Sequence, residues 1–206
     1  MERSCDTLAC VPVLRSPHGS QAPHRGRRRP LPRDVRGNAR QPIFLDDFDY
    51  ATFLQWLSKT IERFEWRCHG FCLMPNHFHL MLETPDPNLA LGMQLLIGTY
   101  ARRFNWRYRR AGHVFQGPYH STMVEREPHL LELCRYIAMN PVRADLVADP
   151  ADWPWSSYRA TAGLERVPPY LRVDRVRSLF AVAGSSGAEG FRDFVAAANV
   201  TLDLAA

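Results

Sequence analysis

The sequence contains no apolar run long enough to cross a membrane. A spanning helix needs about 18 or more consecutive apolar residues, and no segment of the 206-residue chain approaches that length. The first residues also lack the charged and then apolar order of a secretory signal peptide. Cysteines number only five and do not follow the spacing of a disulfide framework. These absences predict a reduced, cytoplasmic protein without a membrane partner.

Lysine is nearly missing as well. Lys59 is the single lysine among 26 basic residues, so arginine carries almost all of the positive charge. The formal net charge is +5, but residues 1–40 hold nine arginines against three acidic residues, and the remainder is slightly negative. The overall charge therefore does not predict a globally basic nucleic-acid-binding domain. Arginine suits bidentate phosphate contacts, and GC-rich coding explains the same bias.

Regular periodicity is absent from the first 35 residues. This segment has five prolines and an arginine cluster at 25–29, and its apolar residues follow neither a period of 2 nor one of 3.6. We therefore expect residues 1–35 to form an irregular basic leader that is disordered. A basic arm that touches DNA phosphates is the alternative for this segment.

From Pro42 onward the apolar residues are regular and numerous enough to fill a core. Two strands are predicted at 68–74 and 77–83, joined by a tight turn at Pro75-Asn76. Asn88 is expected to cap the second of the predicted helices, and Pro141 to end the third. The predicted helices cover 47–65, 89–110, 127–140, 174–181 and 190–199. Strands and helices without regular βαβ alternation indicate an α+β fold.

The strongest local feature is the sequence His77-Phe78-His79. Residues two apart in a strand point to the same face, so both imidazoles project together while Phe78 enters the opposite layer. Two neutral imidazoles side by side supply half of a divalent-metal site. Surface or hydrogen-bonded histidines give the same short pattern by accident, so the pair alone leaves both interpretations open.

Tyr136 and Asn140 form a second feature. Their i, i+4 spacing puts them on one face of the helix that precedes Pro141. In one interpretation Tyr136 is a core residue with its hydroxyl at the rim. In the other, Tyr136 is a nucleophile and Asn140 supplies an oxygen ligand to a metal held by His77 and His79.

The third feature is the stretch YARRFNWRYRR at 100–110, in which arginines alternate with aromatic residues. Arginine grips phosphates and aromatic rings stack on unpaired bases, a combination typical of single-strand binding. A solvated helix end, where cations complement the helix dipole, explains the same composition. The candidate DNA-binding residues are Arg102, Arg103, Trp106, Arg107, Arg109 and Arg110.

Two cysteines, Cys68 and Cys72, precede the histidine pair and suggest zinc as another hypothesis. The Cys-x₃-Cys spacing followed by His-x-His is not that of a standard zinc finger. In strands, both cysteines are explained more simply as small core residues.

Five strings of the sequence carry a resemblance to a known family. They are RGNARQPIFLDDFDY (36–50), LMPNHFHLML (73–82), FNWRYRRAGHVFQGPYHS (104–121), YIAMNPVRADLV (136–147) and DWPWSSYRA (152–160). In these strings, over roughly residues 36–198, the chain resembles the REP-associated tyrosine transposases, a branch of the single-tyrosine transposases in the HUH superfamily. The resemblance implies a ferredoxin-like antiparallel sheet flanked by helices, with a catalytic domain over 36–160 and a C-terminal helical extension over 161–206.

The resemblance also implies a site and a reaction. In that family the histidine pair binds Mg²⁺ or Mn²⁺, which maps to His77 and His79, and a helical tyrosine attacks DNA, which maps to Tyr136. The position four residues on, a metal ligand in related transposases, maps to Asn140. Tyr136 is then expected to cut single-stranded DNA at hairpins of palindromic repeats and to form a 5′-phosphotyrosine link. The protein would be a monomer or homodimer associated with the nucleoid.

One segment departs from the family pattern. Family members carry the first sheet strand just before the RGN string, whereas residues 24–35 are rich in arginine and proline here and cannot alternate as a strand. We therefore expect the first strand to be missing or altered, which would expose an edge beside the His-x-His strand. Under that expectation the alternative to an active transposase is a degenerate copy that binds repeat hairpins without cleaving them.

Overall fold

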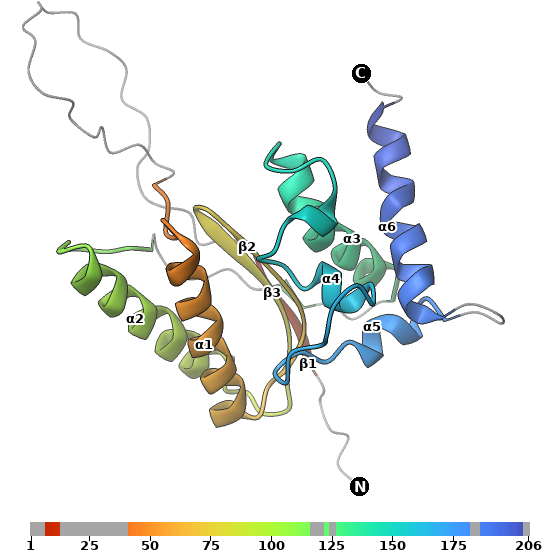
Figure 1. Ribbon diagram of the computed structural model, residues 1–206. Helices are drawn as coiled ribbons and strands as arrows, with labels where there is room; N and C mark the ends of the chain where they lie inside the picture. Colours follow the sequence, from red (N-terminus) through yellow and green to blue (C-terminus); the bar gives the residue numbers. More distant parts are fainter. Residues whose placement is uncertain (1–6, 13–40, 116–121, 124–126, 182–185, 204–206) are drawn as a thin grey trace, which may run out of the picture.

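The computed structural model describes residues 7–12, 41–115, 122–123, 127–181 and 186–203. Helices lie on both sides of a central sheet (Figure 1). In chain order the elements are β1 (Thr7–Pro12), α1 (Asp47–Phe64), β2 (Arg67–Met74), β3 (His77–Thr84), α2 (Leu89–Arg107), β4 (Thr122–Met123), α3 (Glu127–Arg143), the 3-10 turn η1 (Pro150–Asp152), α4 (Tyr158–Thr161), α5 (Asp174–Ser178) and α6 (Gly187–Asp203).

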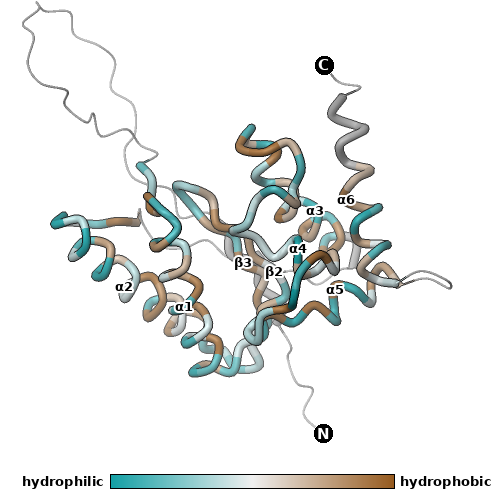
Figure 2. Tube along the Cα trace, in the orientation of Figure 1, coloured by the Kyte–Doolittle hydropathy of each residue, from teal (hydrophilic) through white to brown (hydrophobic). Residues whose placement is uncertain are grey.

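The sheet has four strands in the order β2-β3-β1-β4, and each neighbouring pair is antiparallel. Helices α1 and α2 cover one face, and α3 to α6 lie on the other (Figure 1). In Figure 2 hydrophilic and hydrophobic residues alternate along the helices, as expected of amphipathic helices that cover a sheet. The expected α+β fold, an antiparallel sheet flanked by helices, is confirmed.

The β2–β3 hairpin follows from the sequence in the predicted way. Its strands run to either side of the turn at Pro75-Asn76, and successive side chains of β3 face opposite layers. Phe78, Leu80 and Leu82 pack with α1 and α2, whereas Met81 packs with α3 and α6. The strand that carries the histidine pair therefore has two buried faces.

The two layers differ in composition. The α1–α2 side is rich in stacked rings, with the Phe53 ring centroid 4.7 Å from that of Phe78 and 5.3 Å from that of Tyr100. Among the residues whose side chains are described, the α3–α6 side contains five buried sulfur-bearing side chains, which are Cys72, Met74, Met81, Cys134 and Met139.

The prediction of an irregular leader is wrong for Thr7–Pro12. These residues form β1, which pairs with β3 from Thr7↔Thr84 to Pro12↔His79 and with β4 on its other side. The strand is therefore neither missing nor supplied by 24–35, and β3 is not left as an edge. A short run of strand-forming residues, closed by Pro12, was hidden in the average composition of a longer proline-rich segment. The rest of the leader lies outside the described residues.

The prediction that α3 stops at Asn140 is also wrong, because α3 continues through Pro141 to Arg143. Proline removes one helical N–H, but close to a helix end the remaining hydrogen bonds suffice. The backbone N–H of Ala144 donates to the Asn140 carbonyl at 3.1 Å, and Asp145 then ends the helix with a left-handed φ of 54°.

The other helix boundaries shift by a few residues. Helix α2 ends at Arg107 rather than Arg110, because Arg109 has a left-handed φ of 49°. Asn88 precedes α2, but its side chain does not cap the helix; it accepts from Trp66 Nε1 at 2.6 Å and donates to the Phe64 carbonyl at 3.2 Å. Helix α5 is shorter and α6 longer than predicted. Across the described helices, none combines the length and hydropathy needed to span a bilayer.

The end of β3 far from the hairpin turn holds a buried ion network around Glu83. His69 Nε2 lies 2.8 Å from Glu83 Oε2, and its Nδ1 lies 3.1 Å from the Arg172 carbonyl oxygen. Arg175 donates to Glu83 at 2.9 Å, and Arg67 donates to the other carboxylate oxygen. Burial would raise the pKa of Glu83, but its hydrogen bonds to His69 and Arg67 lower it overall. The network joins β2, β3 and α5.

Candidate active site

The two histidines of β3 lie side by side on the face that α3 covers. The ring centroids of His77 and His79 are 4.9 Å apart and the rings are perpendicular. His79 is fully buried, whereas His77 is half-buried with its Nδ1 2.7 Å from Asn76 Oδ1. The strand geometry thus produces the side-by-side pair that the sequence predicted.

Tyr136 of α3 meets this pair. Its ring is perpendicular to that of His79, with a centroid distance of 5.3 Å, and 38% of the residue is exposed. The structure therefore brings a solvent-accessible phenol from α3 to the histidine pair of β3.

Asn140 stands one turn beyond Tyr136 on the same helix. Its amide Nδ2 donates to the Tyr136 carbonyl at 3.0 Å, and the residue is 8% exposed. Because the amide nitrogen is used in this way, the side-chain oxygen remains as the group with which Asn140 can bind a cation.

The environment of His79 keeps its imidazole neutral. Burial first, and the neighbouring His77 second, lower the pKa of His79 to about 3, while the nearby Asn140 side chain partly opposes this shift. Within the described part of the chain, neither ring nitrogen of His79 has a hydrogen-bond partner of good geometry. A buried, neutral and unpartnered imidazole is costly unless it binds something, and it is the form in which histidine binds metals.

The chemistry of the residues present is compatible with a divalent cation, for which His77, His79 and the Asn140 oxygen would be the ligands. Such a set contains only two imidazoles and an amide. The described residues contain no group of three or more His, Cys, Asp or Glu side chains placed to hold a metal ion.

The cysteines do not join the histidine pair. Cys68 belongs to the core on the α1–α2 side of the sheet and Cys72 to the core on the opposite side. Burial raises the pKa of both thiols to about 12, which disfavours the thiolate that zinc requires. The zinc hypothesis has no geometric support among the described residues.

The arginine-rich end of α2 divides into two groups. Arg107 makes ion pairs with Asp46 at 2.6 Å and with Asp49 at 2.7 Å, and its guanidinium lies 4.4 Å from the centre of the Phe48 ring. Tyr108 also donates to Asp49, at 2.8 Å. Arg107 therefore ties the end of α2 to the start of α1.

The candidate DNA-binding residues other than Arg107 form the second group, which is more accessible to solvent. Trp106 is 81% exposed, and Arg103 and Arg109 are exposed as well. Arg102 donates to Thr99 Oγ1 at 3.1 Å, and Arg110 donates to Gln41 Oε1 at 2.7 Å. A shallow pocket between α1 and α2 is lined by Phe48, Asp49, Thr52, Tyr100, Arg103, Phe104, Trp106 and Arg107.

The surface around Trp106, at the C-terminal end of α2, lies at the same end of the sheet as the histidine pair but on the opposite face. The backbone N–H groups of Ile43 and Phe44, just before α1, both donate to the Pro75 carbonyl in the hairpin turn. A single strand of DNA would have to pass around the turn to contact both places.

The DWPWSSYRA string holds the hairpin in place. Trp153 Nε1 donates to the Leu73 carbonyl at 3.0 Å. Ser157 Oγ accepts from the Phe71 backbone N–H at 2.9 Å. These residues fix the position of β2 and have no contact with Tyr136 among the described interactions.

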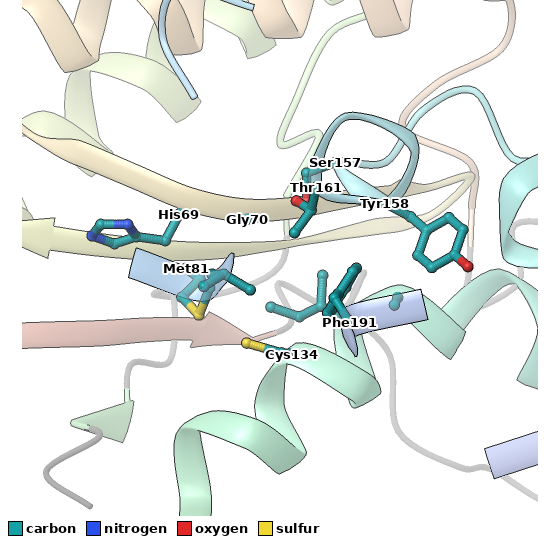
Figure 3. Close-up of a pocket in the computed structure, with 11 residues that line it drawn as sticks. His69, Gly70, Met81, Cys134, Ser157, Tyr158, Thr161 and Phe191 are labelled. Carbon is teal, nitrogen blue, oxygen red and sulfur yellow. The ribbon is translucent and has the colours of Figure 1, made fainter. Parts of the chain in front are cut away.

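A cavity lies between the sheet and helices α3 and α6, away from Tyr136. His69, Met81, Cys134 and Phe191 are among the residues around it, and most of its lining is apolar (Figure 3). Tyr136 and the histidine pair do not line this cavity, although Ile137, next to Tyr136 in the chain, does.

Sequence reasoning missed Arg143. Its guanidinium carbon lies 5.6 Å from the centre of the Tyr136 ring. The i, i+7 spacing from Tyr136 could have found it, but only if the helix were allowed to pass Pro141.

Comparisons with known proteins agree with this architecture. A family model described as "Transposase IS200 like" matches residues 35–140. A Haemophilus influenzae protein named as a REP-associated tyrosine transposase is 27% identical over 133 residues, covering 58% of this chain and 75% of that protein. A solved REP-associated tyrosine transposase bound to a REP hairpin has 15% identity and a TM-score of 0.53, covering 72% of this chain and 85% of its own. The resemblance expected from the five strings is confirmed.

Proposed function

Because the chain belongs to the IS200-like transposase family, we propose that it is a single-strand DNA transposase in which Tyr136 is the nucleophile. The observation that carries this proposal is the position of the Tyr136 ring, 5.3 Å from that of His79 and accessible to solvent. A tyrosine used only for packing would not need a buried imidazole without hydrogen-bond partners beside it.

The reaction is a transesterification. The Tyr136 oxygen attacks the phosphorus of a DNA phosphodiester, a P–O bond forms to the phenol, and the bond from phosphorus to the 3′ oxygen breaks. The phenolic proton leaves to water, which reaches the exposed edge of Tyr136, and the departing 3′ oxygen takes up a proton from water. The products are a 5′-phosphotyrosine and a free 3′-OH, so neither an oxidant nor a nucleotide is consumed. Attack by a 3′-OH on the phosphotyrosine reverses the step and rejoins DNA.

Mg²⁺ or Mn²⁺ is the proposed cofactor, held by His77, His79 and Asn140. When bound, such a cation polarises a phosphoryl oxygen and stabilises the charge that develops on it. The neutral state of His79, with its pKa of about 3, keeps a lone pair available for the cation at physiological pH.

The proposed substrate is hairpin DNA formed by a palindromic repeat. This assignment is supported by the solved structural neighbour, which is bound to a REP hairpin. For strand contacts beyond the site we propose Arg102, Arg103, Trp106, Arg109 and Arg110, because Trp106 offers an exposed ring and exposed arginines surround it. Arg107 is withdrawn from this group because its guanidinium already pairs with Asp46 and Asp49.

Covalent capture on a hairpin oligonucleotide with Mn²⁺ tests the proposal. The wild-type chain should form a protein–DNA adduct that survives denaturation, and Tyr136→Phe should abolish the adduct while hairpin binding survives. Tyr170→Phe is the matched control, because that half-buried tyrosine packs near Phe71. An adduct that persists in Tyr136→Phe would overturn the assignment. Hairpin binding without an adduct under either cation would favour the alternative of a copy that binds repeats and does not cut them.

A further inference from the structure

We propose that Arg143 binds the DNA phosphate that Tyr136 attacks, through its guanidinium group. This inference rests on the proposed function of Tyr136 and adds a residue that lies beyond the segment matched by the family model, which ends at 140. The observation behind it is that the Arg143 guanidinium carbon lies 5.6 Å from the centre of the Tyr136 ring.

The geometry of α3 puts the relevant groups in one row. Tyr136, Asn140 and Arg143 are spaced i, i+4 and i+7, so they lie on the same helix face within two turns. The row exists because α3 continues through Pro141; a helix that ended at Asn140 would leave Arg143 in a loop without a fixed direction. Long side chains on a helix point towards its N-terminus, which carries the Arg143 guanidinium back over Tyr136.

A second observation extends this row by one turn. The pKa of Glu132 is lowered, mainly by its hydrogen bond from Arg135 and in smaller part by the charge of Arg143. Glu132 lies one turn before Tyr136, so the positive charge of Arg143 acts on a group on the N-terminal side of the phenol as well.

The guanidinium of Arg143 is available to an anion. Among the described residues it makes no hydrogen bond or ion pair, and the ring it lies over is that of Tyr136. Two other arginines of the same half of the molecule are engaged: Arg175 pairs with Glu83, and Arg177 donates to the Thr161 and Ala160 carbonyls. Arg143 thus offers its donors to solvent beside the nucleophile, and a phosphodiester accepts such donors in a bidentate manner.

The position of the Arg143 guanidinium over the Tyr136 ring distinguishes phosphate binding from a general effect of a cation at a helix end. A cation in the last turn of a helix complements the helix dipole wherever its side chain points, so that effect does not require contact with Tyr136. A phosphate in line with the Tyr136 oxygen would have the histidine pair on the sheet side and Arg143 on the helix side. Arg143 would then neutralise a non-bridging oxygen as charge develops on it.

A substrate with a neutral scissile linkage tests this assignment. The rate of adduct formation is measured for wild type and Arg143→Ala, on a hairpin oligonucleotide with the natural phosphodiester and on one with a methylphosphonate at the cleavage position. On the phosphodiester, Arg143→Ala should lower the rate about 100-fold, the usual effect of removing one donor to a developing oxyanion. On the methylphosphonate, which lacks the negative charge, the two proteins should react at similar rates.

The controls separate local from general effects. Arg63→Ala is the matched variant, because Arg63 also lies over a ring, 5.7 Å from the centre of Phe64, in the last turn of α1 on the other side of the sheet. It should leave the rate on both substrates unchanged, and Arg143→Lys should retain part of the wild-type rate. Thermal stability of Arg143→Ala should match that of wild type, since the side chain is exposed.

Several outcomes would overturn the inference. Equal losses on the two substrates would make Arg143 a structural residue, and no loss on the phosphodiester would leave it without a role. If neither protein attacks the methylphosphonate, the affinities of the two oligonucleotides are compared in a Tyr136→Phe background. The Tyr136→Phe protein that keeps Arg143 must then bind the phosphodiester oligonucleotide more tightly than the methylphosphonate one. The double variant with Arg143→Ala must bind both with similar affinity. A failure of Tyr136→Phe to abolish the adduct would reject the proposed nucleophile instead, so the two failures are distinguishable.

Discussion

The ring of Tyr136 stands perpendicular to the ring of His79, with 5.3 Å between their centroids, although one lies on α3 and the other on β3. His79 is fully buried, and neither of its ring nitrogens has a hydrogen-bond partner of good geometry among the described residues, although the Asn140 side chain lies nearby. The contact therefore joins an accessible phenol to an imidazole that the fold itself leaves unsatisfied. Replacing His79 should therefore affect the proposed reaction without lowering the stability of the fold.

His79→Leu is expected to abolish adduct formation without weakening the fold. Leucine fills the buried space and removes an unpartnered polar group, so the free energy of unfolding without metal should stay level or rise by about 1 kcal/mol. Thermal denaturation with and without Mn²⁺ checks this: the cation should raise the melting temperature of wild type but not of the variant. Met81→Leu, on the same face of β3, serves as the control and should keep both the adduct and the Mn²⁺ effect. A variant less stable by more than about 2 kcal/mol would show that His79 is a packing residue.

Arg107→Ala and Trp106→Ala should behave in opposite ways, although the two residues are adjacent. Loss of Arg107 breaks its ion pairs with Asp46 and Asp49 and should lower the melting temperature by several degrees. Loss of Trp106, whose ring is exposed, should leave the melting temperature unchanged but weaken binding of a single-stranded oligonucleotide, by up to about 10-fold for one stacked base. Scanning calorimetry and a fluorescence-polarisation titration separate the two effects. Equal DNA affinity in wild type and Trp106→Ala would remove this surface from the proposed interface.

The pH dependence of stability should carry a contribution from Glu83. Its pKa is lowered in the folded protein, so between the folded and the unfolded values the unfolded chain binds more protons. The stabilisation is therefore complete above the unfolded value of about 4.5 and is lost as the pH falls through the folded value. Urea denaturation at several pH values from neutral to acid measures this. Glu83→Gln should be less stable at neutral pH and should show a flatter decline below pH 4.5; parallel curves would mean that the network contributes nothing.

Gly92→Ala should destabilise the protein by about 1–3 kcal/mol, the range for an overpacked core. A Cβ at this position would lie 2.1 Å from an atom of the Trp66 ring, so α2 could not keep its distance from that ring. Gly98→Ala on the same helix is the control, since the nearest atom to its Cβ is a flexible arginine nitrogen at 3.8 Å. That change should stabilise the helix by up to about 1 kcal/mol. Chemical denaturation of both variants measures the difference, and similar stabilities would contradict the predicted packing of α2.

Ala9→Pro tests whether β1 completes the sheet. Ala9 is paired with Leu82 on one side and with Met123 on the other, and proline cannot donate a backbone hydrogen bond. The variant should be less stable than wild type and should aggregate more readily, because β3 would lose a pairing partner and become an edge. Light scattering and denaturation measure both effects. Unchanged behaviour would mean that residues 7–12 are dispensable for the sheet.

The hairpin and the site could be predicted from the sequence because each depends on local spacing. Alternation in β3 places His77 and His79 together, and the i, i+4 spacing places Asn140 beside Tyr136. That α3 would bring Tyr136 to His79, however, followed from the resemblance to a family and not from any local pattern. Long-range packing of this kind leaves no mark on a short window of sequence.

The missed features share a physical cause. Composition averaged over a proline-rich segment concealed the six residues of β1, whose pairing partner lies far away in the chain. Local rules predict a helix stop before Pro141, whereas a proline near the end of a helix costs only one hydrogen bond there. The ion pairs of Arg107 with Asp46 and Asp49 have no local signal, because these partners are remote in sequence. These features depend on the surrounding structure, which local sequence patterns do not encode.

The difference between the two sides of the sheet has a mechanical consequence. On one side β3 rests on interlocked aromatic rings, whose shape leaves few alternative arrangements. On the other side, the core between α3 and the hairpin includes the unbranched thioethers of Met74, Met81 and Met139, which adapt their shape at little energetic cost. We therefore expect any change in the distance between Tyr136 and His79 to come from a small movement of α3 and not of β3.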